Sequence, residues 1–132
     1  MRDDQLKFEV FGGTNEKKIV IIAHGLFGSG RNWRVVAKKL SDVGRKVIVV
    51  DMRNHGLSFW HDSHCYDDLA NDLRNIVMAF GDSADIIGHS MGGKAAMVLA
   101  LCYPQCVNKL IVVDIAPKAY SHDQLNYISA ME

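Results

Sequence analysis

A serine lies between two glycines at residues 88–92, where the sequence reads Gly-His-Ser-Met-Gly. The Gly-x-Ser-x-Gly pattern is typical of a nucleophilic serine on a sharp turn between a strand and a helix, where flanking glycines relieve crowding. An apolar strand-like run precedes Ser90 and an apolar helical stretch follows it, as this chemistry requires. Free N–H groups at a helix N-terminus also stabilise developing negative charge. Ser90 is therefore our candidate nucleophile; alternatively, it only caps the helix and the glycines serve close packing.

A glycine-rich stretch at residues 24–30, His-Gly-Leu-Phe-Gly-Ser-Gly, follows the first apolar run. A loop of this kind at the carboxyl end of a strand can offer a backbone N–H to an oxyanion. We therefore expect Leu26 and Met91 to donate the two N–H groups of an oxyanion hole. A phosphate-binding loop is disfavoured, because neither a Gly-Lys-Ser/Thr ending nor Gly-x-Gly-x-x-Gly spacing is present. A purely structural turn stays open as an alternative.

Apolar, β-branched runs alternate with helical periodicity along the chain, and these elements must position the candidate residues. Strands buried on both faces are predicted over residues 18–23, 46–50, 84–88 and 110–113. Helices are predicted over residues 33–40, 69–80 and 94–102, the last buried on more than one side. Residues 6–11 alternate in polarity, which predicts an antiparallel edge strand. The order indicates an α/β fold, a mostly parallel sheet with flanking helices.

Composition restricts the classes of function that fit the chain. Its 132 residues suit one domain, and 15 basic residues balance 15 acidic ones, which leaves no basic field for nucleic acid. The longest apolar stretch, residues 95–102, has eight residues and is too short to span a bilayer. The charged start lacks the apolar run of a signal peptide, and three cysteines do not suggest a disulfide framework. We therefore expect a cytoplasmic protein with no membrane span and no nucleic-acid partner.

Four motifs stand in the order and rough spacing of an α/β-hydrolase, at residues 24–29, 51–58, 88–94 and 114–117. Together they resemble most the bacterial YbfF-type esterases and their mitochondrial abhydrolase-domain relatives. This resemblance implies a serine esterase that acts on small acyl esters or thioesters such as acyl-CoA, without a metal or organic cofactor. It also implies Ser90 as nucleophile and Leu26 and Met91 as oxyanion-hole residues. Leu26, Phe27 and Met91 would line an apolar acyl site.

Asp114 is the candidate acid of a catalytic triad. It ends the predicted strand that follows the nucleophile helix, at the same edge of the sheet as Ser90. The resemblance implies that this branch of the fold takes its acid from this position. The alternative is a loop cap ahead of Pro117, since carboxylates at strand ends are also common in turns. For Asp51, which ends the neighbouring strand, we expect a role in pinning backbone or in pairing with Arg53.

The candidate triad lacks an assigned base. In this fold the chain order is serine, acid, then histidine on a loop after the last strand. Five of the six histidines precede Ser90, and His122 falls where the family begins its cap, so it remains only an alternative base. His61 and His64 could suggest a metal site, but without further ligand spacing a solvated loop is favoured.

The match to the family ends early. We divide the chain into the N-terminal part of an α/β-hydrolase core, residues 1–117, and the truncated start of a cap region, residues 118–132. The expectation is a serine hydrolase that forms an acyl-Ser90 intermediate and is impaired by truncation. The alternative is a non-catalytic remnant, or one half of a split hydrolase that needs a complementary chain. An unpaired last strand also predicts self-association.

Overall fold

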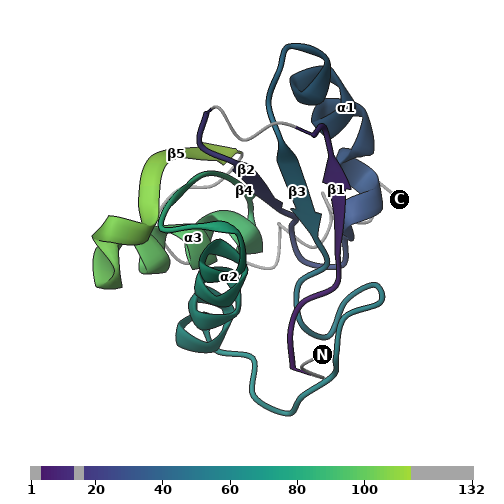
Figure 1. Cartoon of the computed structure of the whole chain (residues 1–132). Helices are drawn as coiled ribbons and strands as arrows, with labels where there is room; N and C mark the ends of the chain where they lie inside the picture. The colour runs from purple at the N-terminus through teal and green to yellow at the C-terminus, as the bar shows by residue number, and fades with distance from the viewer. Residues whose placement is uncertain (1–3, 14–16, 114–132) are drawn as a thin grey trace.

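The computed structural model describes residues 4–13 and 17–113, which build a five-stranded sheet with helices on both faces (Figure 1). The strand order is β1-β3-β2-β4-β5; β2 to β5 run parallel and β1 pairs antiparallel with β3. The strands are β1 (Phe8–Phe11), β2 (Val20–Ala23), β3 (Val47–Val50), β4 (Ala84–His89) and β5 (Val107–Val113). The predicted α/β class, the mostly parallel sheet and the antiparallel edge strand are confirmed.

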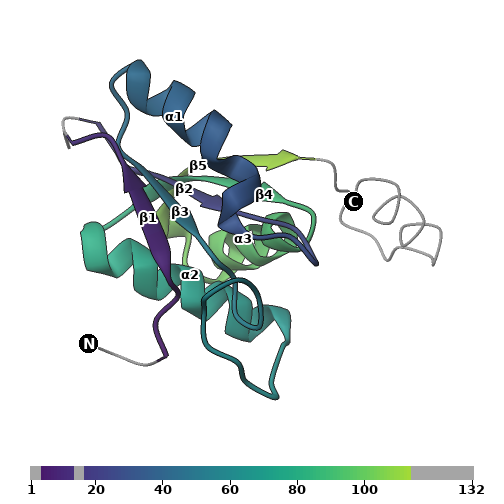
Figure 2. The ribbon, with the colours of Figure 1, turned by 90° about the vertical axis from the view of Figure 1, so that its right-hand side faces the viewer.

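Helices cover the two faces of the sheet unequally. One face carries α1 (Arg34–Asp42), which follows a 3-10 turn, η1 (Gly30–Trp33). The other face carries α2 (Tyr66–Phe80) and α3 (Met91–Cys102), and a second 3-10 turn, η2 (Pro104–Cys106), leads into β5. Figure 2 shows α1 on one side of the strands and α2 and α3 on the opposite side.

The central strands bury both of their faces because successive side chains point to opposite sides of the sheet. In β2, Val20 and Ile22 pack with Ala37 of α1, whereas Ile21 and Ala23 pack into the larger core beneath α2 and α3. Strand β3 alternates in the same way. This double burial explains why both strands are continuous apolar runs in the sequence. The parallel pairing of β2 with β4 places their carboxyl ends beside each other.

Two predictions, on the burial of β5 and of α3, need correction. The strand expected to be buried on both faces at residues 110–113 is the end of β5, where Ile111 is 56% exposed. Among the described residues β5 pairs only with β4, so one of its edges has no partner there. The helix α3 packs on α2 and on the sheet as expected, but Leu101 near its end is 83% exposed. Apolar sequence alone does not reveal which side lacks a neighbour.

We expect the purified 132-residue chain to self-associate through β5, because a flat apolar edge can pair with the edge of another copy. Light scattering at about tens of micromolar, the range in which exposed edges aggregate, measures this association. Ile111→Lys places a charge on the strand and should reduce it. Val43→Lys, at an equally exposed apolar position beyond α1, should not. A wild-type monomer that melts cooperatively would contradict the prediction.

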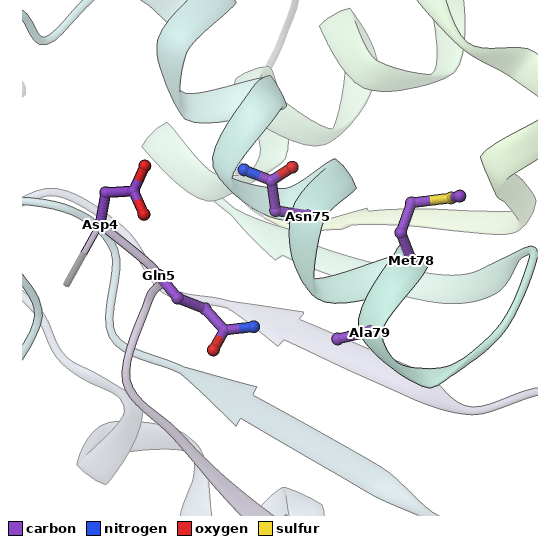
Figure 3. Close-up of a pocket in the computed structure, with 5 residues that line it drawn as sticks. All are labelled: Asp4, Gln5, Asn75, Met78 and Ala79. Atoms are coloured by element: carbon purple, nitrogen blue, oxygen red, sulfur yellow. The ribbon is translucent and has the colours of Figure 1, made fainter. Parts of the chain in front are cut away.

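A pocket lies between the segment before β1 and α2, away from the glycine-rich turns (Figure 3). Its lining includes no serine, cysteine or histidine, so it offers no nucleophile or imidazole base. The lining residues are Asp4, Gln5, Asn75, Met78 and Ala79. Of the helices in the described ranges, none is long and apolar enough to cross a membrane.

Candidate active site

Ser90 stands alone between a strand and a helix. Strand β4 ends at His89 and α3 begins at Met91, so the chain reverses its course within one residue. The backbone of Ser90 has φ 54° and ψ −115°. A positive φ in a residue other than glycine costs on the order of 1–3 kcal/mol and is concentrated at functional sites. Ser90 occupies the N-cap position of α3, but its side chain makes no capping hydrogen bond, so capping does not explain a serine here.

The glycines around Ser90 are required by close backbone contacts. A Cβ on Gly88 would lie 2.6 Å from the Gly92 carbonyl oxygen and from the Gly93 Cα. A Cβ on Gly92 would lie 2.2 Å from the carbonyl oxygen of Ala23 at the end of β2. Both distances are shorter than any real Cβ contact. The predicted role of these glycines in relieving crowding is therefore supported by the geometry of the turn.

The glycine-rich loop after β2 packs directly against this turn. The Gly92 N–H donates to the His24 carbonyl oxygen at 3.2 Å. A Cβ built on Gly25 would lie 3.0 Å from the Ser90 Cβ, so only glycine lets the loop approach so closely. Within the loop, the Gly28 N–H donates to the Gly25 carbonyl oxygen at 3.0 Å and closes a turn over residues 25–28. The turn that contains Leu26 thus begins beside the serine.

The two candidate donors have amides that their neighbours leave available. Met91 is the first residue of α3, where backbone N–H groups have no partner within the helix. Between described residues, neither the Met91 nor the Leu26 N–H donates a hydrogen bond. The side chain of Met91 is 5% exposed and packs in the core, whereas its role in lining an acyl site stays a prediction. Leu26 and Phe27 are exposed at the loop surface.

The remaining triad candidates fall at the end of the chain. Asp114 and His122 lie outside the described residues, as does the division at residues 117 and 118. The last described residue, Val113, accepts a hydrogen bond from the Ser90 N–H at 3.3 Å through its carbonyl oxygen. The end of β5 is therefore joined to the serine turn.

His24 is a structural residue beneath the loop. It is 1% exposed, and its Nε2 accepts the Met52 N–H at 2.9 Å. Since Nε2 is an acceptor, the ring proton is on Nδ1, which donates to the Gly25 carbonyl oxygen at 2.8 Å. Burial lowers the pKa of His24 to about 4, so the ring is neutral at pH 7. His24 holds the start of the loop rather than serving as a base.

Asp51 binds the end of the glycine-rich loop at Gly30, as expected from its predicted role in pinning backbone. Its Oδ1 accepts the Gly30 N–H at 2.7 Å and its Oδ2 accepts the Leu57 N–H at 3.0 Å. The predicted pairing with Arg53 is wrong, because Arg53 points to α2 instead and binds Asp72 there. Both carboxylate oxygens of Asp51 accept backbone N–H groups. The guanidinium of Arg53 instead binds Asp72, a partner that proximity in the sequence does not suggest.

Arg53 and Asp72 form a buried ion pair with two parallel hydrogen bonds. Nε of Arg53 lies 2.6 Å from one Asp72 oxygen, and Nη2 lies 2.9 Å from the other. A third donor, Nη1, binds the Ser63 carbonyl oxygen at 2.9 Å, and the guanidinium lies over the Phe59 ring. The hydrogen bonds that Arg53 donates to Asp72 raise the pKa of Arg53. This pair fastens the loop after β3 to α2.

His55 is a residue near the site to which sequence analysis assigned no function. Its Nε2 accepts the Phe27 N–H at 3.1 Å, so it touches the turn that carries Leu26. Phe27 and His55 lie 28 residues apart in two different loops, and no spacing rule relates such positions. The only signal in the sequence was the place of His55 in the motif at residues 51–58. The two other histidines of this loop also accept hydrogen bonds: His61 from the Ser63 N–H, and His64 from the Asn54 side-chain amide.

A family model for the alpha/beta hydrolase fold matches residues 18–131, which is most of the chain. The chain belongs to this family. A match of this extent confirms the resemblance expected from the four motifs, and it agrees with the sheet order and the serine turn described above. Alpha/beta hydrolases place the nucleophile at the top of the sheet between a strand and a helix, where this chain places Ser90.

Similar proteins of known name include esterases and a lipase. The sn-1-specific diacylglycerol lipase ABHD11 of Danio rerio is 42% identical over 96% of this chain and 41% of its own length. Esterase YbfF of Escherichia coli is 43% identical over 80% of this chain and 43% of its own length. A solved marine microorganism esterase superposes with a TM-score of 0.85 at 41% identity, covering 96% of this chain and 48% of that one. The chain thus spans less than half the length of these relatives.

Proposed function

We propose that the chain is the nucleophile-bearing part of a serine hydrolase that acts on acyl esters or thioesters through an acyl-Ser90 intermediate. The observation that carries this proposal is the backbone of Ser90, with φ 54° between β4 and α3 and the glycine loop packed against it. A strained, uncapped serine at this point has no evident structural use. The esterase and lipase names of the relatives support an ester as the substrate class.

The proposed reaction begins when Ser90 Oγ attacks the acyl carbonyl carbon. The carbonyl oxygen becomes an oxyanion, which the N–H groups of Leu26 and Met91 stabilise by hydrogen bonds that strengthen as the charge develops. The alcohol or thiol then leaves, and water hydrolyses the acyl-enzyme. Asp114 is the proposed acid, supported by the bond between Ser90 N–H and the preceding residue, Val113. The base would be a histidine that follows the acid in the chain.

A burst-phase assay with p-nitrophenyl acetate tests this proposal. We expect an acetyl group on Ser90, seen by intact mass and peptide mapping. Steady-state turnover should be at least about 10³-fold below that of the full-length Escherichia coli relative, the usual scale for an incomplete triad. Absence of any acetyl adduct would refute the proposal. Comparable turnover would instead assign the base to His122, and His122→Ala should then abolish it.

A second candidate function is a non-catalytic remnant or one half of a split hydrolase that binds a complementary chain. The observation that favours it is the outer edge of β5, which pairs with no strand among the described residues. A complementary half would raise turnover when added to the purified chain, whereas a remnant would stay inactive. Activity towards thioesters and a cytoplasmic location remain predictions.

A further inference from the structure

We propose that His55 is a positioning residue for the oxyanion hole: its ring holds in place the turn at residues 25–28, which carries the Leu26 N–H. This inference rests on the proposed function, because the turn matters only if an oxyanion forms beside Ser90. His55 does not touch the reacting atoms in this scheme. It acts through the Phe27 amide, one peptide away from the amide of Leu26.

The turn is one that Phe27 does not favour by itself. Phe27 has φ 63°, whereas Leu26 is not among the residues with positive φ, and this combination at the two central positions is that of a type II turn rather than type I. Glycine is the residue normally found at the third position of such a turn. A type I turn would let Phe27 adopt a negative φ, and the two forms differ by a flip of the Leu26–Phe27 peptide. A contact outside the turn must therefore select the observed form.

His55 supplies a contact that exists in only one of the two forms. Its Nε2 accepts the Phe27 N–H at 3.1 Å. Its Nδ1 lies 2.9 Å from the Arg53 carbonyl oxygen, which can only accept, so the ring proton is on Nδ1 and Nε2 is a bare acceptor. If the peptide flipped, the Phe27 N–H would turn away and the Leu26 carbonyl oxygen would face the lone pair of Nε2. The bond therefore favours the type II turn.

The ring of His55 is itself held in place from several sides. Its backbone N–H donates to the Met52 carbonyl oxygen at 3.1 Å, and its ring lies against the rings of His24 and His64, with centroids 5.2 and 5.9 Å away. The Arg53 carbonyl that fixes its tautomer belongs to the residue anchored on α2 through Asp72. Because His24 and Asp51 hold only the ends of the loop, His55 is the contact with its middle among the described hydrogen bonds.

The experiment measures how fast a fluorophosphonate labels Ser90, by intact mass, in the full 132-residue chain. The phosphoryl oxygen of this probe occupies the oxyanion hole, so the rate reports on Leu26. We expect His55→Leu to slow labelling about 10- to 100-fold, the scale for misplacing a catalytic group by about 1 Å. His55→Gln, whose side-chain oxygen can accept the Phe27 N–H, should recover most of the rate. His61→Leu, in the same loop, should leave it unchanged.

A double variant separates positioning from general damage to the fold. In Phe27→Gly the positive φ is no longer disfavoured, so the turn should need His55 less. We therefore expect the effect of His55→Leu to shrink several-fold when it is combined with Phe27→Gly, the coupling expected of residues in contact. An equal effect in both backgrounds would overturn the inference.

The remaining outcomes are also decisive. Wild-type labelling of Ser90 in His55→Leu would overturn the positioning role and leave the proposed function standing. A wild-type chain that is not labelled at Ser90 would overturn the proposed function and this inference with it. Should His55→Leu fail to fold, the ¹⁵N NMR spectrum of the wild-type imidazoles gives the answer. The inference requires the proton of His55 on Nδ1, and a proton on Nε2 would refute it.

Discussion

Replacing Ser90 with alanine should abolish covalent labelling of the chain by a fluorophosphonate. The probe reacts with a nucleophilic serine beside N–H donors, which is the role proposed for Ser90, on a turn that contacts His24 and Gly25. Labelling of the wild type should be slow, because no described residue serves as its base. Intact mass spectrometry measures the adduct, and peptide mapping locates it.

The matched control for this change is Ser41→Ala. Ser41 lies on α1, where its hydroxyl donates to the Lys38 carbonyl oxygen. It is distant from Ser90 in the sequence, and α1 lies on the opposite side of the sheet from α3 (Figure 2). We expect full labelling of this variant. An adduct that persists unchanged in Ser90→Ala would show that another side chain reacts, and the nucleophile assignment would have to be abandoned.

Replacing Asp72 with alanine should lower the free energy of unfolding by about 3–5 kcal/mol, the range for breaking a buried ion pair by removing one partner. Both side chains are almost fully buried, with exposed fractions of 10% for Arg53 and 5% for Asp72. Without Asp72 the guanidinium loses two hydrogen bonds in a place that water barely reaches. It keeps only a longer contact with Asp68, whose carboxylate oxygen lies 3.7 Å from Nη1. Urea denaturation followed by circular dichroism measures the change.

Two further variants test the cause of this loss. Asp67→Ala removes an exposed carboxylate from the first turn of the same helix and should cost less than about 1 kcal/mol, the size of a helix-terminus charge effect. Replacing Arg53 and Asp72 together with leucine should restore much of the lost stability, because the one carboxylate that then loses its partner, Asp68, is 31% exposed and stays hydrated. A loss in Asp72→Ala no larger than that in Asp67→Ala would refute this account of the pair.

The fold and the serine turn could be predicted because each depends on neighbours in the sequence. Strands β2 and β3 contact a different layer with alternate residues, so burial on both faces appears directly as a run of valine and isoleucine. The serine turn is recognised from a pattern of five residues, and Gly88 is required by contacts within it, although Gly92 is required by Ala23 at the end of β2. The edge strand β1 was foreseen from its alternation.

The tertiary structure alone decided which residues hold the site together. Arg53 could have paired with nearby Asp51, yet it binds Asp72, 19 residues away on α2, while Asp51 accepts backbone N–H groups. The bond between His55 and Phe27 joins two loops that meet only when β2 and β3 lie side by side. Exposure of β5 likewise depends on which strands surround it. Sequence determines local geometry through steric rules, whereas partners across loops follow from how the sheet brings distant segments together.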